Sequence, residues 1–246
     1  MKTLQNKVAI VTGGSRGIGA EISLCLAKAG AKVVVNYVKN QEAAEQVCQE
    51  IIKAGGECLA VKADVSNPTD VIMLFDQTIA DFGRADILIN NAGILIFKPI
   101  ADISNDEFKR IFDINVNGVF YTLREAATRL ADNGRVVNIS STVTRLMLPK
   151  YGIYAATKGA VEQLTRVFAK EVGEKGITAN IVSPGPVDTE LFRAAKTEET
   201  IKKMAAMAAL GRIGEVDDIA QIVLFLVSEK ARWVTGQNIG ANGGMV

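Results

Sequence analysis

The sequence contains no histidine among its 246 residues and only three cysteines, five prolines and one tryptophan. The absence of histidine excludes a histidine general base, a Ser-His-Asp triad and any histidine metal site. The cysteines, Cys25, Cys48 and Cys58, form no Cys-x-x-Cys pair, and isolated cysteines most often serve as small buried hydrophobes. We therefore expect neither a disulfide nor a bound metal, in keeping with a reducing compartment.

The chain also lacks an excess of charge and long apolar runs. It has 28 basic and 27 acidic side chains, a formal net charge of +1, which gives no electrostatic reason to bind nucleic acid or an anionic membrane. No apolar run approaches the roughly 18 residues of a membrane span. Residues 1–7 are polar and do not resemble a signal peptide. We expect a soluble, cytoplasmic protein without membrane or nucleic-acid partners.

Short apolar segments alternate with helical patterns along the whole chain. Several segments, such as VAIV, VVV and ILI, are continuously apolar, which is typical of parallel strands covered on both faces. The alternation predicts an α/β protein of the Rossmann type, one doubly wound parallel sheet in a single domain over residues 1–246. The predicted strands are 8–12, 32–36, 57–63, 86–90, 135–140, 177–182 and 238–240, and the predicted helices are 18–29, 41–54, 68–82, 106–130, 153–174 and 216–228.

Residues 189–214 interrupt this alternation, because an additional helical stretch at 198–209 precedes the next regular helix. In doubly wound proteins, ligands lie over the carboxyl ends of the strands. This segment follows such an end and is a candidate substrate lid. An ordinary surface helix is the alternative.

A glycine-rich turn, TGGSRGIG at residues 12–19, joins the first predicted strand to the first helix. Glycines allow a tight turn and a close approach of the backbone to a pyrophosphate, and the helix N-terminus supplies free N–H groups. The turn therefore predicts a dinucleotide site that is contacted by Gly13, Ser15, Arg16, Gly17, Ile18 and Gly19.

The second predicted strand ends without the acidic residue that holds the ribose 2′-OH of NAD. Asn36 stands there, followed by Tyr37 and Lys39, and Arg16 lies in the glycine-rich turn on the same side. A missing carboxylate and two nearby cations favour a 2′-phosphate. NADP(H) is therefore the predicted cofactor, although solvated side chains remain the alternative for both cations.

Ser141, Tyr154 and Lys158 form the predicted catalytic centre. Tyr154 and Lys158 are four residues apart at the start of a predicted helix, and this spacing places them on one face. A nearby ammonium favours the phenolate of tyrosine, whose ordinary pKa is about 10. Ser141 ends the fifth predicted strand, where its hydroxyl can hydrogen-bond a substrate oxygen. Without histidine, Tyr154 is the best candidate to donate a proton to a carbonyl reduced by the cofactor.

The order of these motifs resembles the short-chain dehydrogenase/reductase family, which carries T-G-x-x-x-G-x-G, N-N-A-G and Y-x-x-x-K in this order. The resemblance extends from Lys7 to the C-terminal TGQNIGANGG. The chain is most similar to 3-oxoacyl-carrier-protein reductases and to related NADPH-dependent carbonyl reductases. The resemblance implies a strand order of 3-2-1-4-5-6-7 and a homo-oligomer, either a dimer or a tetramer.

The resemblance also implies roles for individual residues. Asn115 in DINVNGVF would hold a water in a proton relay, which completes a catalytic set with Ser141, Tyr154 and Lys158. Asp64 and Val65 would lie beside the adenine. The remaining expected cofactor contacts are Asn91, Ala92, Gly93, Tyr154, Lys158, Pro184, Gly185, Val187 and Thr189.

These observations predict NADPH-dependent reduction of a ketone or keto ester to a secondary alcohol. A 3-oxoacyl-carrier-protein reductase and a non-catalytic NADP-binding sensor are the alternatives. Carrier-protein reductases need cations around the cleft, and the resemblance implies one where this chain has Asp132, whereas Lys175 keeps the second. We therefore expect free hydrophobic substrates in preference to those on an acyl carrier protein. The expected apolar pocket walls are Ile94, Leu95, Val143, Met147, Leu191, Phe192, Met204 and Met207.

Overall fold

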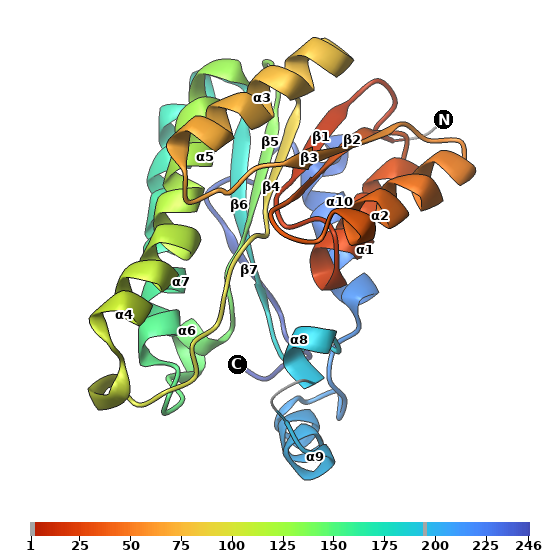
Figure 1. Ribbon diagram of the computed structural model, residues 1–246. Coiled ribbons are helices and arrows are strands. Elements are labelled where there is room, and N and C mark those ends of the chain that lie inside the picture. Colours follow the sequence, from red (N-terminus) through yellow and green to blue (C-terminus); the bar gives the residue numbers. More distant parts are fainter. Residues whose placement is uncertain (1–2, 194–195) are drawn as a thin grey trace.

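A computed structural model describes residues 3–193 and 196–246, although not the side chain of Leu191. In this part of the chain, seven parallel strands form one sheet in the order β3-β2-β1-β4-β5-β6-β7 (Figure 1). The predicted fold class and strand order are therefore confirmed. The strands are β1 Val8–Val11, β2 Lys32–Tyr37, β3 Cys58–Lys62, β4 Ile87–Asn90, β5 Arg135–Ile139, β6 Thr178–Pro184 and β7 Asn238–Ala241.

Helices cover both faces of the sheet (Figure 1). Successive residues of β2 enter different apolar clusters, since Val33 and Val35 pack on one side and Val34 on the other. All three are fully buried, which explains why this strand is continuously apolar. One face is covered by α1 Gly17–Lys28, α2 Gln41–Lys53 and α10 Val216–Val227, and the other by α3 Pro68–Phe82, α5 Gly118–Arg129 and α7 Gly152–Glu171.

Local capping explains why some helices begin and end as predicted. The side chain of Asn67 accepts a hydrogen bond from the Thr69 N–H (3.0 Å), and Pro68 occupies the first turn of α3. Gly83 ends the same helix in the left-handed conformation. Asn40 caps α2 in the same way, through Ala43 (3.0 Å).

The helix predicted over 106–130 contains a wider turn that the sequence did not reveal. The structure has α4 Asn105–Phe112, then a π-helical turn at Asp113–Asn117, and then α5. The wider turn contains Asn115, which is fully buried. Helical periodicity alone does not reveal such a turn, because the turn depends on contacts with other segments.

Three short helices lie beyond the carboxyl ends of the strands. They are α6 Val143–Leu146, which the sequence did not predict, α8 Glu190–Arg193 and α9 Glu198–Met207. Figure 1 shows α8 and α9 projecting together from this end of the sheet. The candidate lid over 189–214 therefore contains the expected helix, although residues 194–195 of this segment lie outside the described residues.

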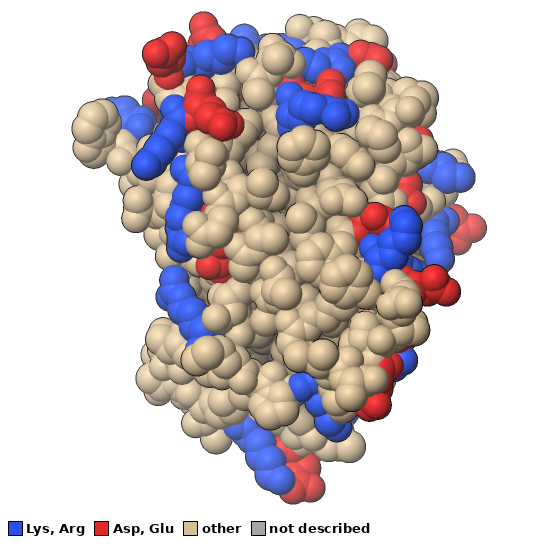
Figure 2. Space-filling model, turned by 90° about the vertical axis from the view of Figure 1, so that its left-hand side faces the viewer, with Lys and Arg blue, Asp and Glu red and all other residues tan. Residues whose placement is uncertain are grey.

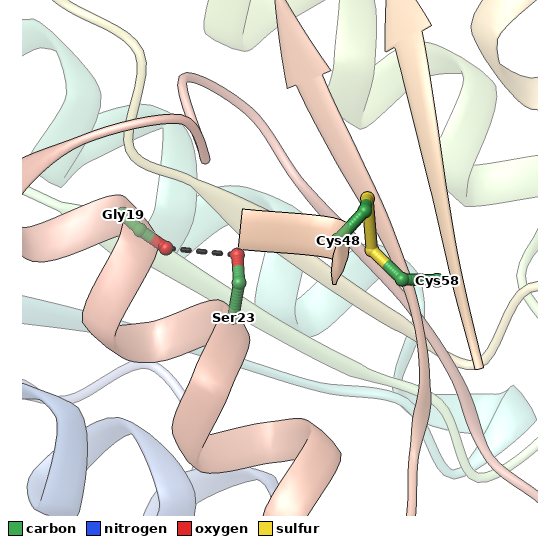
Figure 3. The surroundings of a disulfide bond; sticks show 4 residues. All are labelled: Gly19, Ser23, Cys48 and Cys58. Atoms are coloured by element: carbon green, nitrogen blue, oxygen red, sulfur yellow. Dashed lines mark hydrogen bonds between the residues drawn. A yellow bond between two sulfur atoms is a disulfide. The ribbon is translucent and has the colours of Figure 1, made fainter. Parts of the chain in front are cut away.

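Cys48 and Cys58 form a disulfide, so the prediction of three unpaired cysteines is wrong. The bridge joins α2 to β3 with the two Cα atoms 5.1 Å apart, within the usual range of disulfides. Figure 3 shows it beside α1, where Ser23 donates a hydrogen bond to the Gly19 carbonyl (2.9 Å). Spacing in the sequence does not reveal this pair, because α2 must first fold back along β3. Cys25 remains free and buried.

Among the described residues, no helix has both the length and the apolar character that a membrane span requires.

The disulfide can be tested by thiol counting and by unfolding. We expect one free thiol in the denatured, non-reduced protein and three after reduction. Because the bridge closes a loop with a sequence separation of 10, loop-closure entropy predicts that Cys48→Ser lowers the free energy of unfolding by roughly 2–3 kcal/mol. Urea unfolding without reductant measures this loss, and Cys25→Ser is the control for substitution of a buried thiol. Three free thiols before reduction would contradict the bridge.

Candidate active site

A cleft of about 1270 Å³ lies at the carboxyl ends of the strands. Pockets for drug-sized ligands measure about 300–1,000 Å³, so this cleft is larger than a single small ligand requires. Most of the predicted cofactor and catalytic residues line it. These are Gly13, Ser15, Arg16, Gly17, Ile18, Tyr37, Lys39, Asp64, Val65, Asn91, Ala92, Gly93, Ser141, Tyr154, Lys158, Pro184, Gly185, Val187 and Thr189.

The glycine-rich turn has the backbone shape that glycine permits. Gly13 and Gly17 have φ angles of +61° and +52°. A Cβ atom at Gly19 would lie 2.3 Å from the Gly13 carbonyl oxygen, so this glycine is required by packing within the turn. Gly19 itself does not line the cleft. The first turn of α1 contains no acidic residue, and its N-terminus suits an anionic group.

The turn is fastened to the end of β4 by Thr12 and Asn91. The Thr12 hydroxyl accepts hydrogen bonds from the N–H groups of Asn91 (3.0 Å) and Ala92 (3.1 Å). In return, the Asn91 amide donates to the carbonyls of Thr12 (3.1 Å) and Gly13 (3.0 Å). The sequence gives no local signal for this role of Thr12, since its partners are about 80 residues away along the chain.

Asn36 does not lie in the cleft, which corrects the prediction of a direct cofactor contact. Its side chain is buried, and its amide donates to the carbonyls of Val61 (3.3 Å) and Ala63 (2.8 Å). Its oxygen accepts from the N–H of Gly13 (3.2 Å). Asn36 therefore holds the glycine-rich turn against β3. A carboxylate here would face two carbonyl oxygens, so this position does not accept an aspartate freely.

Arg16 and Lys39 both line the cleft and are exposed, and Arg16 is the N-cap residue of α1. Two cations therefore lie at the end of the cleft formed by the glycine-rich turn and the end of β2. Within residues 3–193 and 196–246, no carboxylate lies within 4 Å of the charged group of Arg16 or Lys39. They remain available to a polyanionic ligand.

Asp64 and Val65 follow β3 and line the same end of the cleft. One carboxylate oxygen of Asp64 accepts hydrogen bonds from the N–H (2.9 Å) and the hydroxyl (2.7 Å) of Ser66. Val65 is buried against Gly118, because a Cβ atom added at Gly118 would lie 2.8 Å from the Val65 side chain. The predicted position of both residues beside one end of the ligand is therefore compatible with the cleft.

Tyr154 and Lys158 meet Ser141 at the other end of the cleft. Lys158 is buried, donates to the Ile139 carbonyl (2.7 Å), and has its Nζ 5.7 Å from the centre of the Tyr154 ring. Burial raises the pKa of Tyr154 to about 12, opposed by a hydrogen bond with Ser141. Burial lowers the pKa of Lys158 to about 8. The expected shift of Tyr154 towards its phenolate is therefore reversed, and its phenol stays protonated near neutrality.

Asn115 does not line the cleft but supports it from behind. Its side-chain oxygen accepts from the Ile94 N–H (2.9 Å), and its amide donates to the Ile94 carbonyl (2.9 Å) and the Thr157 hydroxyl (3.1 Å). A Cβ atom at Gly93 would lie 3.3 Å from the same oxygen and 3.6 Å from the Lys158 Nζ. Asn115 thus joins the segment after β4 to α7.

Several apolar side chains line the cleft. Six of the eight expected wall residues line it, whereas Met147 is 81% exposed and lies elsewhere, and the side chain of Leu191 lies outside the described residues. Other residues that line the cleft were not predicted, because they come from separate segments. These are Leu146, Leu148, Tyr151, Pro186 and Met245.

Asp132 and Lys175 do not border the cleft within one chain. Both precede strands at their amino ends, where Asn133 donates to the Lys175 carbonyl (2.8 Å) and β5 begins at Arg135. Ser141 lies at the opposite end of β5. The expectation that Asp132 repels an acidic partner at the cleft is therefore wrong for the single chain.

Thr12→Val should test the fastening of the glycine-rich turn. Valine keeps the shape of threonine but leaves the N–H groups of Asn91 and Ala92 without their acceptor, at about 1–3 kcal/mol for each unsatisfied group. We expect a loss of at least about 2 kcal/mol in the free energy of unfolding, measured with urea. Thr12→Ser keeps the hydroxyl and is the matched control. Equal stability of the two variants would show that the hydroxyl does not hold the turn.

Comparison with known proteins agrees with this geometry. A family model described as Enoyl-(Acyl carrier protein) reductase matches residues 13–246. An uncharacterized oxidoreductase of Methylorubrum extorquens is 43% identical over 247 residues, all of both chains. Versicolorin reductase of Emericella nidulans is 40% identical, over 98% of this chain and 96% of its own.

A solved structure is also similar in fold. The angucycline C-6 ketoreductase LanV with bound NADP superposes with a TM-score of 0.93 at 37% identity, over 99% of this chain and 96% of its own. The matched region contains the glycine-rich turn, the Asn-Asn-Ala-Gly segment and the Tyr154 and Lys158 pair. The chain belongs to the short-chain dehydrogenase/reductase family.

Proposed function

We propose that the protein is an NADPH-dependent carbonyl reductase, which converts a ketone or keto ester to a secondary alcohol. One observation carries the proposal. Tyr154, Lys158 and Ser141 lie together in the same cleft as the glycine-rich turn and the cations Arg16 and Lys39. A proton donor and a site for a phosphorylated dinucleotide therefore share one cavity, as a hydride-transfer enzyme requires.

The residues at the end of the cleft formed by the glycine-rich turn and the end of β2 fit NADPH. The turn at Gly13 and Gly17 and the N-terminus of α1 suit the pyrophosphate. Arg16 and Lys39 suit the 2′-phosphate, and the absence of an acid at the end of β2 removes a repulsive charge. A bound nicotinamide supplies the hydride. NADP bound to the similar ketoreductase LanV supports this cofactor.

At the other end, this chain's own residues would handle the proton. The Ser141 hydroxyl orients the substrate oxygen, and the protonated phenol of Tyr154 donates to it as the carbonyl carbon is reduced. The pKa of about 12 keeps this phenol protonated before the reaction. The Lys158 Nζ, close to the Tyr154 ring, stabilises the phenolate that is left behind.

Free, hydrophobic carbonyl compounds fit the rest of the cleft. Its lining includes Ile94, Val143 and Leu148, and Met204, Met207 and Met245 contribute side chains that adapt to varied shapes. The names versicolorin reductase and ketoreductase in similar proteins support this class of substrate. A carrier-bound 3-oxoacyl thioester is the second candidate, since the family description refers to an acyl carrier protein.

Assembly as a homo-oligomer and a cytoplasmic location stay predictions. Figure 2 shows the side of the molecule on which α5 and α7 lie, with charged side chains at its margins and uncharged residues across its centre. Large apolar side chains of α4, α5 and α7 are exposed, including Phe108 (51%), Phe120 (46%) and Val167 (57%). Such a surface would suit contact with a second copy of the chain.

Tyr154→Phe tests the proposed reaction. Removal of the phenolic oxygen should lower kcat for reduction of an activated ketone by at least about 100-fold. Binding of NADPH, followed by its fluorescence, should be nearly unchanged. Tyr121→Phe makes the same chemical change on α5, away from the cleft, and should retain full activity. A fully active Tyr154→Phe enzyme would refute the mechanism, and a wild-type protein that binds NADPH but turns over no carbonyl would favour the sensor alternative.

Replacing both Arg16 and Lys39 by glutamine tests the cofactor. Each charge-assisted contact to phosphate contributes about 1.5–3 kcal/mol, so the preference of kcat/KM for NADPH over NADH should fall by at least about tenfold. Steady-state kinetics with both cofactors measure this ratio. Lys62→Gln, a substitution of an exposed lysine outside the cleft, is the matched control. A wild-type enzyme that uses NADH equally well would contradict the assignment.

A further inference from the structure

A buried carboxylate lies on α7 just beyond the proposed catalytic residues. Glu162 is only 8% exposed, although glutamate is seldom so deeply buried without partners. It follows Lys158 by four residues and Tyr154 by eight, so it lies on the same side of the helix. The mechanism proposed above gives it no part, and it does not line the cleft.

The hydrogen-bond partners of Glu162 flank Ser141 on both sides. Its Oε1 atom accepts from the Ser140 hydroxyl (2.8 Å) and from the Thr144 hydroxyl (2.9 Å). The Thr144 hydroxyl also lies 3.1 Å from the Ser141 carbonyl oxygen. The other carboxylate oxygen is 3.9 Å from the half-exposed Arg166 guanidinium. One oxygen atom therefore holds the residues before and after the substrate-orienting serine.

The opposite side of this loop is tied to β6. The N–H of Ser140 donates to the Val182 carbonyl (2.8 Å), and that of Thr142 donates to the Pro184 carbonyl (2.9 Å). These bonds fix the loop relative to the sheet, but not relative to the helix that carries Tyr154. The Ser141 hydroxyl accepts a long hydrogen bond from the Val143 N–H (3.4 Å) and is also hydrogen-bonded with the Tyr154 phenol. The backbone around Ser141 therefore helps to set the geometry of this second bond.

We propose that Glu162 is a positioning residue for Ser141. This proposal rests on the proposed function. Glu162 fixes the Ser141 loop to α7 and so sets the distance between the Ser141 hydroxyl and the Tyr154 phenol. Hydrogen bonds to a carboxylate are stronger than those to a neutral acceptor, and two of them converge on one atom. A displacement of about 1 Å between reacting groups can cost about 100-fold in rate, so this attachment controls turnover and not cofactor affinity.

Glu162→Met and Glu162→Gln separate the acceptor from the size of the side chain. Methionine has a similar length but accepts no strong hydrogen bond, and we expect kcat to fall by roughly 10- to 100-fold. Glutamine keeps a carbonyl oxygen for Ser140 and Thr144 and should restore most of the activity. The dissociation constant of NADPH should be nearly unchanged in both variants. Glutamine as damaging as methionine would overturn the proposal.

A second variant removes the hydroxyls instead of the carboxylate. Ser140→Ala combined with Thr144→Val should lose as much kcat as Glu162→Met. Arg166→Gln is the matched control, because it removes the charge beside Oε2 and leaves both bonds to Oε1 in place. It should have nearly wild-type turnover. Loss of activity in Arg166→Gln together with full activity in the hydroxyl variant would contradict the proposal.

A double-mutant cycle with Ser141→Ala distinguishes positioning from general damage to the fold. If Glu162 acts through Ser141, Glu162→Met should cause little further loss of kcat once the serine hydroxyl is gone. If the losses of kcat from Glu162→Met and Ser141→Ala are fully additive, the proposal is overturned. This holds even if Tyr154→Phe is inactive, as the proposed function expects. A merely structural role would instead lower the melting temperature and the stoichiometry of NADPH binding in both backgrounds. Failure of the proposed function is distinct, since wild-type protein would then reduce no carbonyl at all.

Discussion

The reciprocal hydrogen bonds between Thr12 and Asn91 are the constraint on which the cleft depends. They join the ends of β1 and β4, so the glycine-rich turn is held against the segment that leads to Gly93 and the proposed catalytic end. Since both side chains lie among buried strands, loss of either would leave backbone groups without partners. The close approach also explains Gly13, where an added Cβ atom would lie 3.1 Å from Ala92.

Polar side chains behind the cleft extend this arrangement. Asn36 holds the turn to β3, Asn115 joins the segment after β4 to α7, and Glu162 joins the end of β5 to the same helix. Each is buried with its hydrogen bonds made inside the protein. Buried polar groups of this kind have few alternative partners, so they favour one relative position of the elements that they connect.

Burial also sets the proton chemistry of the site. The same enclosure that raises the pKa of Tyr154 lowers that of Lys158 to about 8, because both charged forms lose solvation. Burial therefore favours the protonated phenol of Tyr154, and the Lys158 Nζ lies 5.7 Å from the centre of its ring.

Sequence patterns alone predicted the class of fold and most of the cofactor and catalytic residues that line the cleft, and the family resemblance supplied the strand order. The patterns are local, namely continuous apolar strands, glycines in a turn and the four-residue spacing of Tyr154 and Lys158. The contacts of Thr12, Asn36, Asn115 and Glu162, the bridge between Cys48 and Cys58, and the position of Asp132 away from the cleft are evident only in the folded chain. These features arise from contacts between segments far apart in the chain. Residue type and spacing do not specify which buried polar group meets which partner, because the packing of helices on the sheet determines it.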